Sequence, residues 1–325
     1  MVGAGAFGRN HARVYRQLQE QGEAVRLAAV VDADTERADA VAQEHGARAF
    51  GSVEQMISTR NEIQAATVAV PTVRHLDVAR ALMEAGIDVL IEKPLATSLD
   101  EARELIRLAN SHNRVAQAGH LERFNPAVLA TAGLITQPMF FEVHRLSVFT
   151  PRSLDVDVIL DLMIHDLDVV LSFVNSPVKE IRAVGLPILS GKVDIANVRM
   201  EFQSGCVANF TASRVSTERV RKLRFFQPRQ YISIDYARQD VLVFSVGAEG
   251  DPSANPQIKM AKPAVTSEEP LLAELRSFLH AVRTHSRPAV TLEDGRRALA
   301  VALDVMAAIR EHGEKVDLDK LTAQG

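Results

Sequence analysis

The sequence begins with a glycine-rich turn, GAGAFG, that places Gly3, Gly5 and Gly8 at the G-x-G-x-x-G spacing. A helical stretch follows, and Asp32 then closes the apolar run LAAVVD. In such a unit the first glycine permits a tight turn, the second lets the backbone approach a pyrophosphate, and the third lets the helix pack closely. The motif therefore predicts a dinucleotide site at the N-terminus of a helix, although a glycine-rich loop that binds nothing is the alternative for an isolated motif.

The acid that follows the motif indicates which dinucleotide is bound. A carboxylate at Asp32 would accept hydrogen bonds from the ribose hydroxyls and repel a 2′-phosphate, so NAD is favoured over NADP. Arg37 lies too far along the chain to reverse that preference. Only Met1 and Val2 precede Gly3, so the first strand is expected to be stunted or to lack residues in this sequence. The cofactor-binding residues predicted from this stretch are Gly3, Gly5, Ala6, Phe7, Gly8 and Asp32.

The first 120 residues alternate short apolar runs with amphipathic stretches, which indicates an α/β domain with a parallel sheet. The runs are too continuously apolar for half-exposed strands, as expected where helices cover both faces. Strands are predicted at 27–32, 65–70, 88–92 and 115–119, and helices at 8–21, 34–45, 73–85 and 98–112. This part, 1–120, is the predicted NAD-binding domain.

After about residue 121 the pattern changes to successive strands, which indicates an open, mainly antiparallel sheet. A helix is predicted near 155–174, and extended segments at 179–189, 193–203, 206–215, 219–227, 230–235 and 240–246. A loop is predicted at 247–267, and helices at 268–285 and 293–312. Residues 121–325 form the predicted substrate-binding and oligomerisation domain, with packing of the last helices on the first domain left open.

Two strand ends carry chemistry at the edge of the parallel sheet where ligands bind. The run VLIEKP delivers Glu92 and Lys93 there, and desolvation beside a cofactor would make Lys93 a donor or proton-transfer group. Pro94 restricts Lys93 to extended geometry and could hold a cis bond. At the preceding strand, Pro71, Thr72 and His75 could line a nicotinamide. The alternatives are a solvated turn after the lysine and a helix cap at the threonine.

The segment ILDLMIHDLDVVL carries a third set of polar residues. On a regular helix Asp161, His165 and Asp168 would fall within about 60°, away from the apolar face. At i and i+4, Asp161 could orient an imidazole at His165 that handles a substrate proton. A surface pair without function is the commoner explanation. A zinc-binding pair is less expected, because the sequence offers no obvious third ligand. No metal is predicted.

Composition excludes several classes of partner. The chain has 37 basic and 41 acidic side chains and a net charge of -4, so no positive field favours nucleic acid. The single cysteine, Cys206, fits a reducing compartment, and we expect a cytoplasmic protein. Neither a membrane span nor a secretory signal is indicated. A small molecule is the expected partner.

The glycine motif with Asp32, the EKP at 92–94 and the DLMIHDLD segment together resemble the Gfo/Idh/MocA oxidoreductase family. The resemblance covers nearly the whole chain. It implies a Rossmann domain followed by an α/β domain with an open antiparallel sheet, which often mediates homodimers or homotetramers. It also implies that Lys93, Asp161 and His165 form the catalytic group. Leu162 and Met163 depart from the small residue that many members carry there.

Within the family, GHLERFNPAV and SRVSTERVRKLRFF resemble UDP-N-acetylglucosamine 3-dehydrogenases, which supply an aminotransferase on the route to lipid A precursors. This resemblance implies NAD-dependent oxidation of a sugar secondary alcohol. The implied substrate-binding residues are Lys93, His120, Arg123, Asn125, Asp161 and His165. Basic residues at 214, 219, 221, 222 and 224 offer cations for a diphosphate, with a solvated strand edge as the alternative. An inositol or simple sugar dehydrogenase and a non-catalytic NAD-binding regulator remain open.

Overall fold

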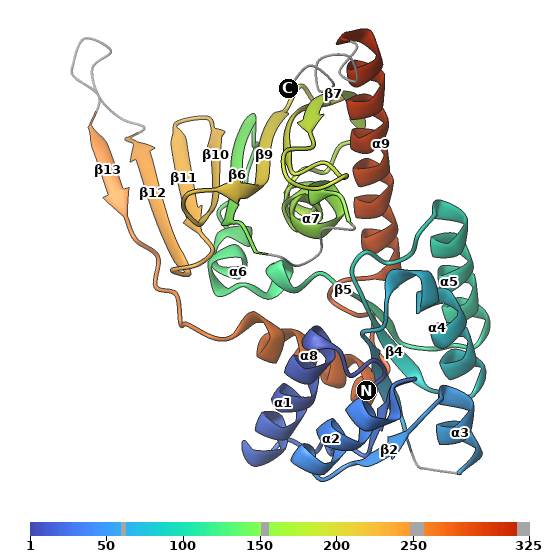
Figure 1. Cartoon of the computed structure of the whole chain (residues 1–325). Helices are drawn as coiled ribbons and strands as arrows, with labels where there is room; N and C mark the ends of the chain where they lie inside the picture. The colour runs from blue at the N-terminus through green and yellow to red at the C-terminus, as the bar shows by residue number, and fades with distance from the viewer. Residues whose placement is uncertain (60–62, 151–155, 248–256, 317–325) are drawn as a thin grey trace. The chain divides into compact units, whose positions relative to one another are not determined.

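The computed structural model describes residues 1–59, 63–150, 156–247 and 257–316 (Figure 1). The chain divides into two compact units. The first unit comprises residues 1–124 and 268–299, and the second comprises residues 125–267 and 300–325. The division falls within helix α9 (Leu292–Val316). Each unit is described by itself below.

The first unit contains a parallel sheet covered by helices, as the alternation of apolar runs and amphipathic stretches predicted. Strand β1 pairs with β2, and β3, β4 and β5 pair in that order, all in parallel. The strands are β1 (Ala29–Val31), β2 (Arg48–Phe50), β3 (Ala65–Val68), β4 (Asp88–Glu92) and β5 (Ala116–Gly119). The helices are α1 (Ala6–Glu20), α2 (Thr35–His45), α3 (Val53–Ser58), η1 (Thr72–Arg74), α4 (His75–Glu84), α5 (Leu99–Ser111), η2 (Leu121–Phe124) and α8 (Pro270–Thr284).

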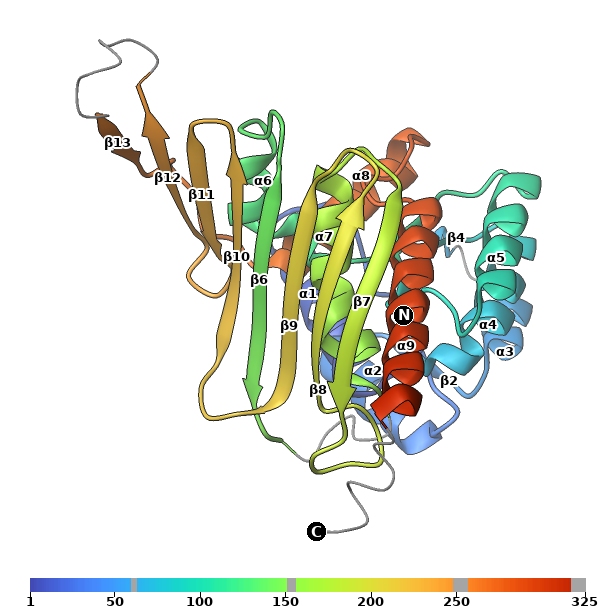
Figure 2. The same ribbon diagram turned by 90° about the horizontal axis from the view of Figure 1, so that it is seen from above.

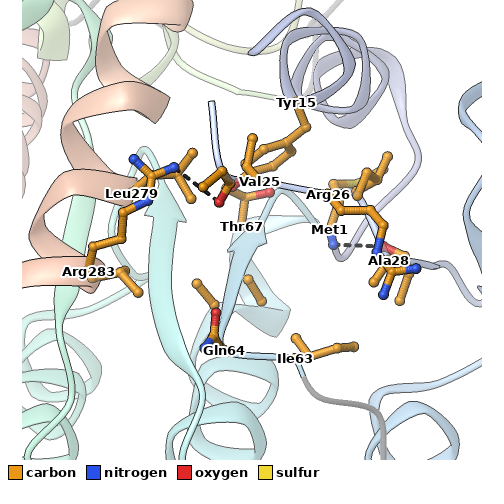
Figure 3. A pocket seen from close by; sticks show the side chains of 16 residues that line it. Met1, Tyr15, Val25, Arg26, Ala28, Ile63, Gln64, Thr67, Leu279 and Arg283 are labelled. Carbon is orange, nitrogen blue, oxygen red and sulfur yellow. Dashed lines mark hydrogen bonds between the residues drawn. The ribbon is translucent and has the colours of Figure 1, made fainter. Parts of the chain in front are cut away.

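The middle of this sheet is held by the first residues of the chain. Val2 forms parallel bridges to Val31 and to Val68, and so joins the β1–β2 pair to the β3–β4–β5 set. The buried ammonium of Met1 donates a hydrogen bond to the Ala29 carbonyl at 3.0 Å. Toward the amino ends of β1 and β3 lies a cavity of about 260 Å³, lined by groups that include Met1, Tyr15, Thr67 and Leu279 (Figure 3). The strand predicted before Gly3 is thus limited to the two bridges of Val2, as short as expected.

Apolar residues at helical spacing place α1, α2 and α8 against the sheet. Their buried side chains, among them Leu18, Val41 and Phe278, form one core cluster with Val30 and Leu90 of the strands. On the remaining helices, α4 packs against α5. The Ser98 hydroxyl accepts the Glu101 N–H at 3.2 Å, which satisfies one of the unpaired donors where α5 begins.

The second unit contains an eight-stranded sheet in the order β13-β12-β11-β10-β6-β9-β8-β7. All neighbours are antiparallel except β6 and β9, which confirms the open, mainly antiparallel sheet. Its strands are β6 (Phe140–Val148), β7 (Val178–Leu186), β8 (Ile195–Phe202), β9 (Val207–Ser216), β10 (Val220–Gln227), β11 (Gln230–Asp235), β12 (Asp240–Val246) and β13 (Ile258–Ala261). Its helical segments are α6 (Pro126–Ala132), η3 (Ile159–Met163) and α7 (Ile164–Phe173), in addition to the later part of α9.

Residues alternate between the two faces of this sheet, as strand geometry requires. On one face, Phe141 of β6 and Phe225 of β10 stack at 5.4 Å between ring centroids, and Phe173 of α7 packs against both. Figure 2 shows helix α7 on this face of the sheet. The other face, here called the outer face, carries Phe140, Phe226, Tyr231 and Phe244 on four neighbouring strands. Successive rings lie 5.6, 4.9 and 5.5 Å apart, and they form an aromatic row.

Some elements were not predicted from the sequence. They are the short elements β2, α3 and α6 and the nine-residue strand β6. The predicted loop at 247–267 is partly wrong, because Ile258–Ala261 pairs with β12 as a strand whose four side chains are exposed. Residues 248–256 of that loop and residue 155 of the predicted helix lie outside the described residues. No helix in the described part of the chain has the length and apolar composition to cross a membrane.

Candidate NAD-binding and catalytic site

The three glycines of the opening motif differ in the space around them. Gly3 has a φ of +94°, and a Cβ there would lie 2.5 Å from the Ala69 carbonyl oxygen. A Cβ at Gly8 would lie 1.7 Å from the Gly3 oxygen, whereas one at Gly5 would meet no atom within 4 Å. The first and third glycines are thus required by the turn and by helix packing, and the second leaves open room. This is the arrangement that lets a backbone approach a pyrophosphate.

The helix that follows leaves its first N–H groups available to an anion. Gly5 is the N-cap residue of α1, and no side chain caps the helix. The first turn carries no acidic residue, so the partial positive charge of the helix N-terminus is not offset there. Ala6 and Phe7, the two predicted cofactor-binding residues of this turn, are exposed. These features favour a phosphate at this position.

Asp32 ties the end of β1 to the glycine turn. Its Oδ2 accepts the Ala4 N–H at 2.6 Å, and its Oδ1 accepts the Asp34 N–H at 2.9 Å. Arg37 lies closer than the sequence suggested, since its Nη1 is 3.7 Å from Asp32 Oδ2 and its Nη2 is 2.9 Å from Asp34 Oδ2. One helical turn thus brings the guanidinium back to the carboxylate, although Arg37 lies five positions further along the chain.

A cavity of about 740 Å³ lies at the carboxyl ends of β1 and β3. Its size is typical of sites for small molecules and cofactors. Gly3, Gly5, Asp32, Arg37, Pro71 and Arg74 contribute to its lining. Thr72 and His75, which the sequence placed beside the nicotinamide, do not line this cavity. Arg74 was not identified from the sequence, because its approach to the cavity depends on the turn through η1.

His75 instead joins the loops that follow two strands. Its Nε2 lies 3.0 Å from the Val70 carbonyl oxygen and its Nδ1 lies 3.3 Å from the Leu95 carbonyl oxygen. Burial lowers the pKa of His75, and the nearby carbonyl groups and Glu92 oppose that change. Because a neutral imidazole has one N–H, it can donate to only one of the two carbonyls. The structure therefore gives His75 a role in fixing the loops after β3 and β4.

Glu92 and Lys93 follow β4 at the same edge of the sheet, as predicted. Lys93 is half-buried, and the peptide bond between Lys93 and Pro94 is cis. Glu92 is 6% exposed, and its Oε1 lies 2.9 Å from Nε2 of His11 on α1. Its Oε2 accepts the main-chain N–H of Lys93 at 3.3 Å. The carboxylate is thus buried against His11, and its contact with the cofactor stays a prediction.

The three residues after β5 have different surroundings. His120 is 1% exposed, and neither of its ring nitrogens has a hydrogen-bond partner among the residues that the structure describes. Arg123 is half-buried in η2. Burial is the largest single effect on the pKa of Asp294 and raises it, but hydrogen bonds from Thr291 and the charge of Arg123 contribute to a net lowering of that pKa. In the second unit, Asn125 caps α6: its Oδ1 accepts the Ala127 N–H at 3.1 Å.

The amide of Asn125 is also used at its other end. Its Nδ2 donates to the Tyr236 carbonyl at 3.1 Å. Both polar groups of the side chain thus have main-chain partners, and the residue is 2% exposed. The structure favours a structural role for Asn125, which fixes the start of α6.

The segment with Asp161 and His165 is not one regular helix. Residues Ile159–Met163 form a π-helical turn, and α7 begins at Ile164. A π turn has a wider hydrogen-bonding pattern than an α-helix, so a wheel with 3.6 residues per turn misplaces Asp161 relative to His165. π turns are frequent at functional sites. Asp161 is half-buried and His165 is 8% exposed.

The polar residues of α7 do not face solvent. Every side chain of α7 from Ile164 to Leu171 is buried, Asp168 included. Asp166 receives a bidentate ion pair from Arg145 of β6, with 2.6 Å between Nε and Oδ2 and 2.9 Å between Nη2 and Oδ1. Buried charges of this kind require pairing, which explains how acidic residues occur on a buried helix.

The basic run from 214 to 224 does not form one cluster. Arg214 is buried, donates to the Val156 carbonyl, and has its Nε 3.6 Å from Asp194 Oδ1. Lys222 and Arg224 lie on the outer face, where Arg224 Nη1 is 3.0 Å from Glu142 Oε2. Lys222 Nζ is 4.0 Å from Asp235 Oδ2. These pairs favour the interpretation of Lys222 and Arg224 as a strand surface.

Metal ligation receives no support from the described part of the chain. No group of three or more His, Cys, Asp or Glu side chains is arranged there to hold a metal ion. The structure instead brings the glycine turn and Asp32 together at one cavity, and Lys93 follows the end of β4 in the same unit.

Residues 1–120 match the oxidoreductase family GFO/IDH/MocA, described as an NAD-binding Rossmann fold, and residues 132–231 match the family's C-terminal domain. UDP-N-acetylglucosamine 3-dehydrogenase from Acidithiobacillus ferrooxidans is 37% identical over 95% of this chain and 96% of its own length. A solved structure of that enzyme superposes with a TM-score of 0.87 at 36% identity, covering 95% of this chain and 96% of the other.

A second relative matches a shorter part of the chain. Inositol 2-dehydrogenase from Rubrobacter xylanophilus is 30% identical over 193 residues, which are 57% of this chain and 54% of that protein. Both family domains match in chain order, and the glycine turn, Asp32 and the adjoining cavity have the geometry of a dinucleotide site. The chain therefore belongs to the Gfo/Idh/MocA family of oxidoreductases, and its first unit is an NAD-binding Rossmann domain.

Proposed function

We propose that this protein oxidises a secondary alcohol of a sugar nucleotide with NAD, and that the substrate is UDP-N-acetylglucosamine, oxidised at C3. The observation that carries the proposal is the 37% identity, over 95% of the chain, to an enzyme named UDP-N-acetylglucosamine 3-dehydrogenase. The cavity beside Asp32 and the open space at Gly5 support NAD as the cofactor.

Lys93, Asp161 and His165 are the proposed catalytic group. Bound NAD supplies the hydride acceptor. The ammonium of Lys93 would stabilise the charge that develops on the substrate oxygen, because a fixed cation at that oxygen favours the transition state over the ground state. The proposed acceptor of the hydroxyl proton is His165 or, in its neutral form, Lys93, and Asp161 supports the imidazole.

Substrate recognition is proposed to involve His120 and Arg123 in addition to the catalytic group. A buried imidazole without a protein partner can exchange hydrogen bonds with a sugar hydroxyl, and a guanidinium suits a phosphate. Asn125 is the weakest member of the set predicted from the sequence, because both ends of its amide have main-chain partners.

An inositol or simple sugar dehydrogenase is the second candidate. The partial match to inositol 2-dehydrogenase favours it, and that match spans 57% of the chain. A non-catalytic NAD-binding regulator is the third, because a fold by itself does not determine function. These three candidates differ in whether they require the nucleotide part of the substrate and in whether they turn over at all.

A substrate panel separates the candidates. NADH formation is measured by absorbance with UDP-N-acetylglucosamine, free N-acetylglucosamine, inositol and glucose. We expect turnover with the UDP sugar above all. Activity on inositol or a free sugar but not on the UDP sugar would favour the second candidate, and NAD binding without turnover on any substrate would favour the regulator.

The role of Lys93 is tested separately. Lys93→Met keeps the length of the side chain and removes its charge, so we expect NAD to bind while turnover is lost. The matched control is Lys192→Met, because Lys192 is an exposed lysine of the second unit. Undiminished NADH formation by Lys93→Met would contradict the role.

We further propose that the protein assembles as a homodimer or homotetramer through the outer face of its eight-stranded sheet. The aromatic row offers the apolar centre that such interfaces use, and Phe226 is 38% exposed. Tyr231→Glu should lower the mass measured by light scattering, whereas Arg103→Ala on helix α5 of the first unit should not. An unchanged mass for Tyr231→Glu would exclude this face.

The proposed substrate also suggests a cellular role. A 3-keto sugar nucleotide is a substrate for an aminotransferase, so we propose a step on the route to lipid A precursors, in the cytoplasm. Its test is a coupled assay in which a sugar aminotransferase and an amino donor convert the product to a 3-amino sugar nucleotide, detected by mass spectrometry. Failure of the aminotransferase to use the product would contradict this role.

A further inference from the structure

A buried imidazole–carboxylate pair lies next to the main chain of Lys93. His11, in the second turn of α1, has a fully buried side chain, and its Nε2 is 2.9 Å from Glu92 Oε1. The other carboxylate oxygen of Glu92 accepts the N–H of Lys93 at 3.3 Å. The pair therefore connects the helix of the glycine motif with the residue proposed as catalytic, across 81 positions of sequence.

The side chains of the pair have little freedom to move. Gly119 of β5 pairs with Glu92 in register, and a Cβ at position 119 would lie 3.0 Å from the Glu92 carboxyl group. The ring of Phe7 contacts His11 edge to face, with 5.2 Å between centroids. The carboxylate and the imidazole are thus each confined by a neighbour as well as by each other.

The contact also defines the tautomer of His11. A carboxylate only accepts hydrogen bonds, so Nε2 of His11 carries the proton that faces Glu92. Nδ1 of His11 has no hydrogen-bond partner among the described residues. The hydrogen bond to Glu92 is therefore the one that orients the imidazole. Removal of the imidazole would leave the Glu92 carboxylate buried without this donor, which is a costly state.

Net stability is a weak reason for burying such a pair, because desolvation offsets much of the attraction between its members. Position is a stronger reason. Glu92 accepts a hydrogen bond from the N–H of Lys93, and the ring of Pro94 restricts the backbone conformation of Lys93 from its C-terminal side. Both contacts restrict the main chain from which the lysine side chain projects.

We propose that His11 and Glu92 are positioning residues, which fix the backbone of Lys93 and so the direction of its ammonium. The proposal rests on the proposed catalytic role of Lys93. This role concerns only the contacts of the two residues with each other and with the main chain of Lys93. Both lie in the first unit, so the argument is complete within it.

The test compares His11→Ala, which removes the donor, with His11→Gln, which keeps a side-chain N–H. We expect kcat to fall by roughly 10- to 100-fold in His11→Ala, because misplacement of a reacting group by about 1 Å costs that much. His11→Gln should recover part of the loss. The dissociation constant of NAD, measured by calorimetry, should change by less than about threefold, because the phosphate-binding turn is kept.

A second measurement does not depend on turnover. The exchange of the Lys93 amide hydrogen, followed by mass spectrometry of the peptide around residue 93, should be faster in Glu92→Met than in the unaltered protein. The peptide around Ser98, whose hydroxyl accepts the Glu101 N–H, is the internal control and should not change. Thermal unfolding of each variant verifies that it is folded.

The outcomes separate this proposal from the proposed function. An active protein in which His11→Ala keeps its kcat, or in which NAD affinity falls as much as kcat, would overturn the positioning role and leave the dehydrogenase intact. If the unaltered protein turns over no sugar, the proposed function fails, and the exchange rate still decides whether Glu92 holds Lys93. Equal exchange in Glu92→Met would overturn the positioning role in either case.

Discussion

Gly5→Ala should abolish cofactor binding while leaving the fold intact. The backbone of Gly5, at φ -66° and ψ -171°, is accessible to alanine, and its Cβ would meet no atom within 4 Å. The free energy of unfolding should therefore stay unchanged or rise by about 0.4 to 1 kcal/mol, since alanine restricts the unfolded chain. The methyl group would occupy the room through which the backbone approaches the pyrophosphate, so NAD should bind at least ~100-fold more weakly, or about 2.7 kcal/mol.

Gly8→Ala is the matched control at the third glycine. Its Cβ would lie 1.7 Å from the Gly3 carbonyl oxygen, less than any non-bonded contact permits, so α1 would have to move. We expect a loss of more than about 4 kcal/mol in the free energy of unfolding, because overlap with backbone cannot be relieved by a rotamer change. Urea unfolding and calorimetric NAD titration measure the two quantities. Wild-type NAD affinity in Gly5→Ala, or wild-type stability in Gly8→Ala, would refute the reasoning.

Two further predictions follow from charged and reactive groups. Asp32→Ala should shift the NADP-over-NAD affinity ratio upward by about tenfold or more, and Arg37→Ala in addition should reverse much of the shift, because the arginine lies 3.7 Å from the carboxylate. Burial raises the pKa of the Cys206 thiol to about 11, so iodoacetamide should label the folded protein far more slowly than the urea-unfolded chain, and equal rates would contradict its burial.

Regular, strongly patterned elements could be predicted from the sequence, and short ones could not. The strand predicted at 88–92 is β4, and the helix predicted at 98–112 is α5, within one residue at each end. The three-residue strand β2 is too short for a pattern to show. Strand β13 has four exposed residues, so its conformation depends on backbone pairing with β12, and the alternation of Ile258, Lys259 and Met260 is too short to predict a strand.

The candidate site divides in the same way. The glycine turn and Asp32 were predictable because a local spacing encodes them. The contact between His11 and Glu92 was not, because it depends on how α1 packs on the sheet. The relative positions of Asp161 and His165 could not be predicted, because the wheel assumed a regular α-helix and the π turn at Ile159–Met163 breaks that period.

The central claim is that Lys93 serves NAD-dependent oxidation of a sugar nucleotide. Its most direct test is the rate of NADH formation with UDP-N-acetylglucosamine, measured for the unaltered protein and for Lys93→Met at saturating NAD. The account predicts turnover by the unaltered protein and its loss in the variant, with NAD still bound in calorimetry. Equal rates for the two proteins, or no NADH from the unaltered protein, would contradict it.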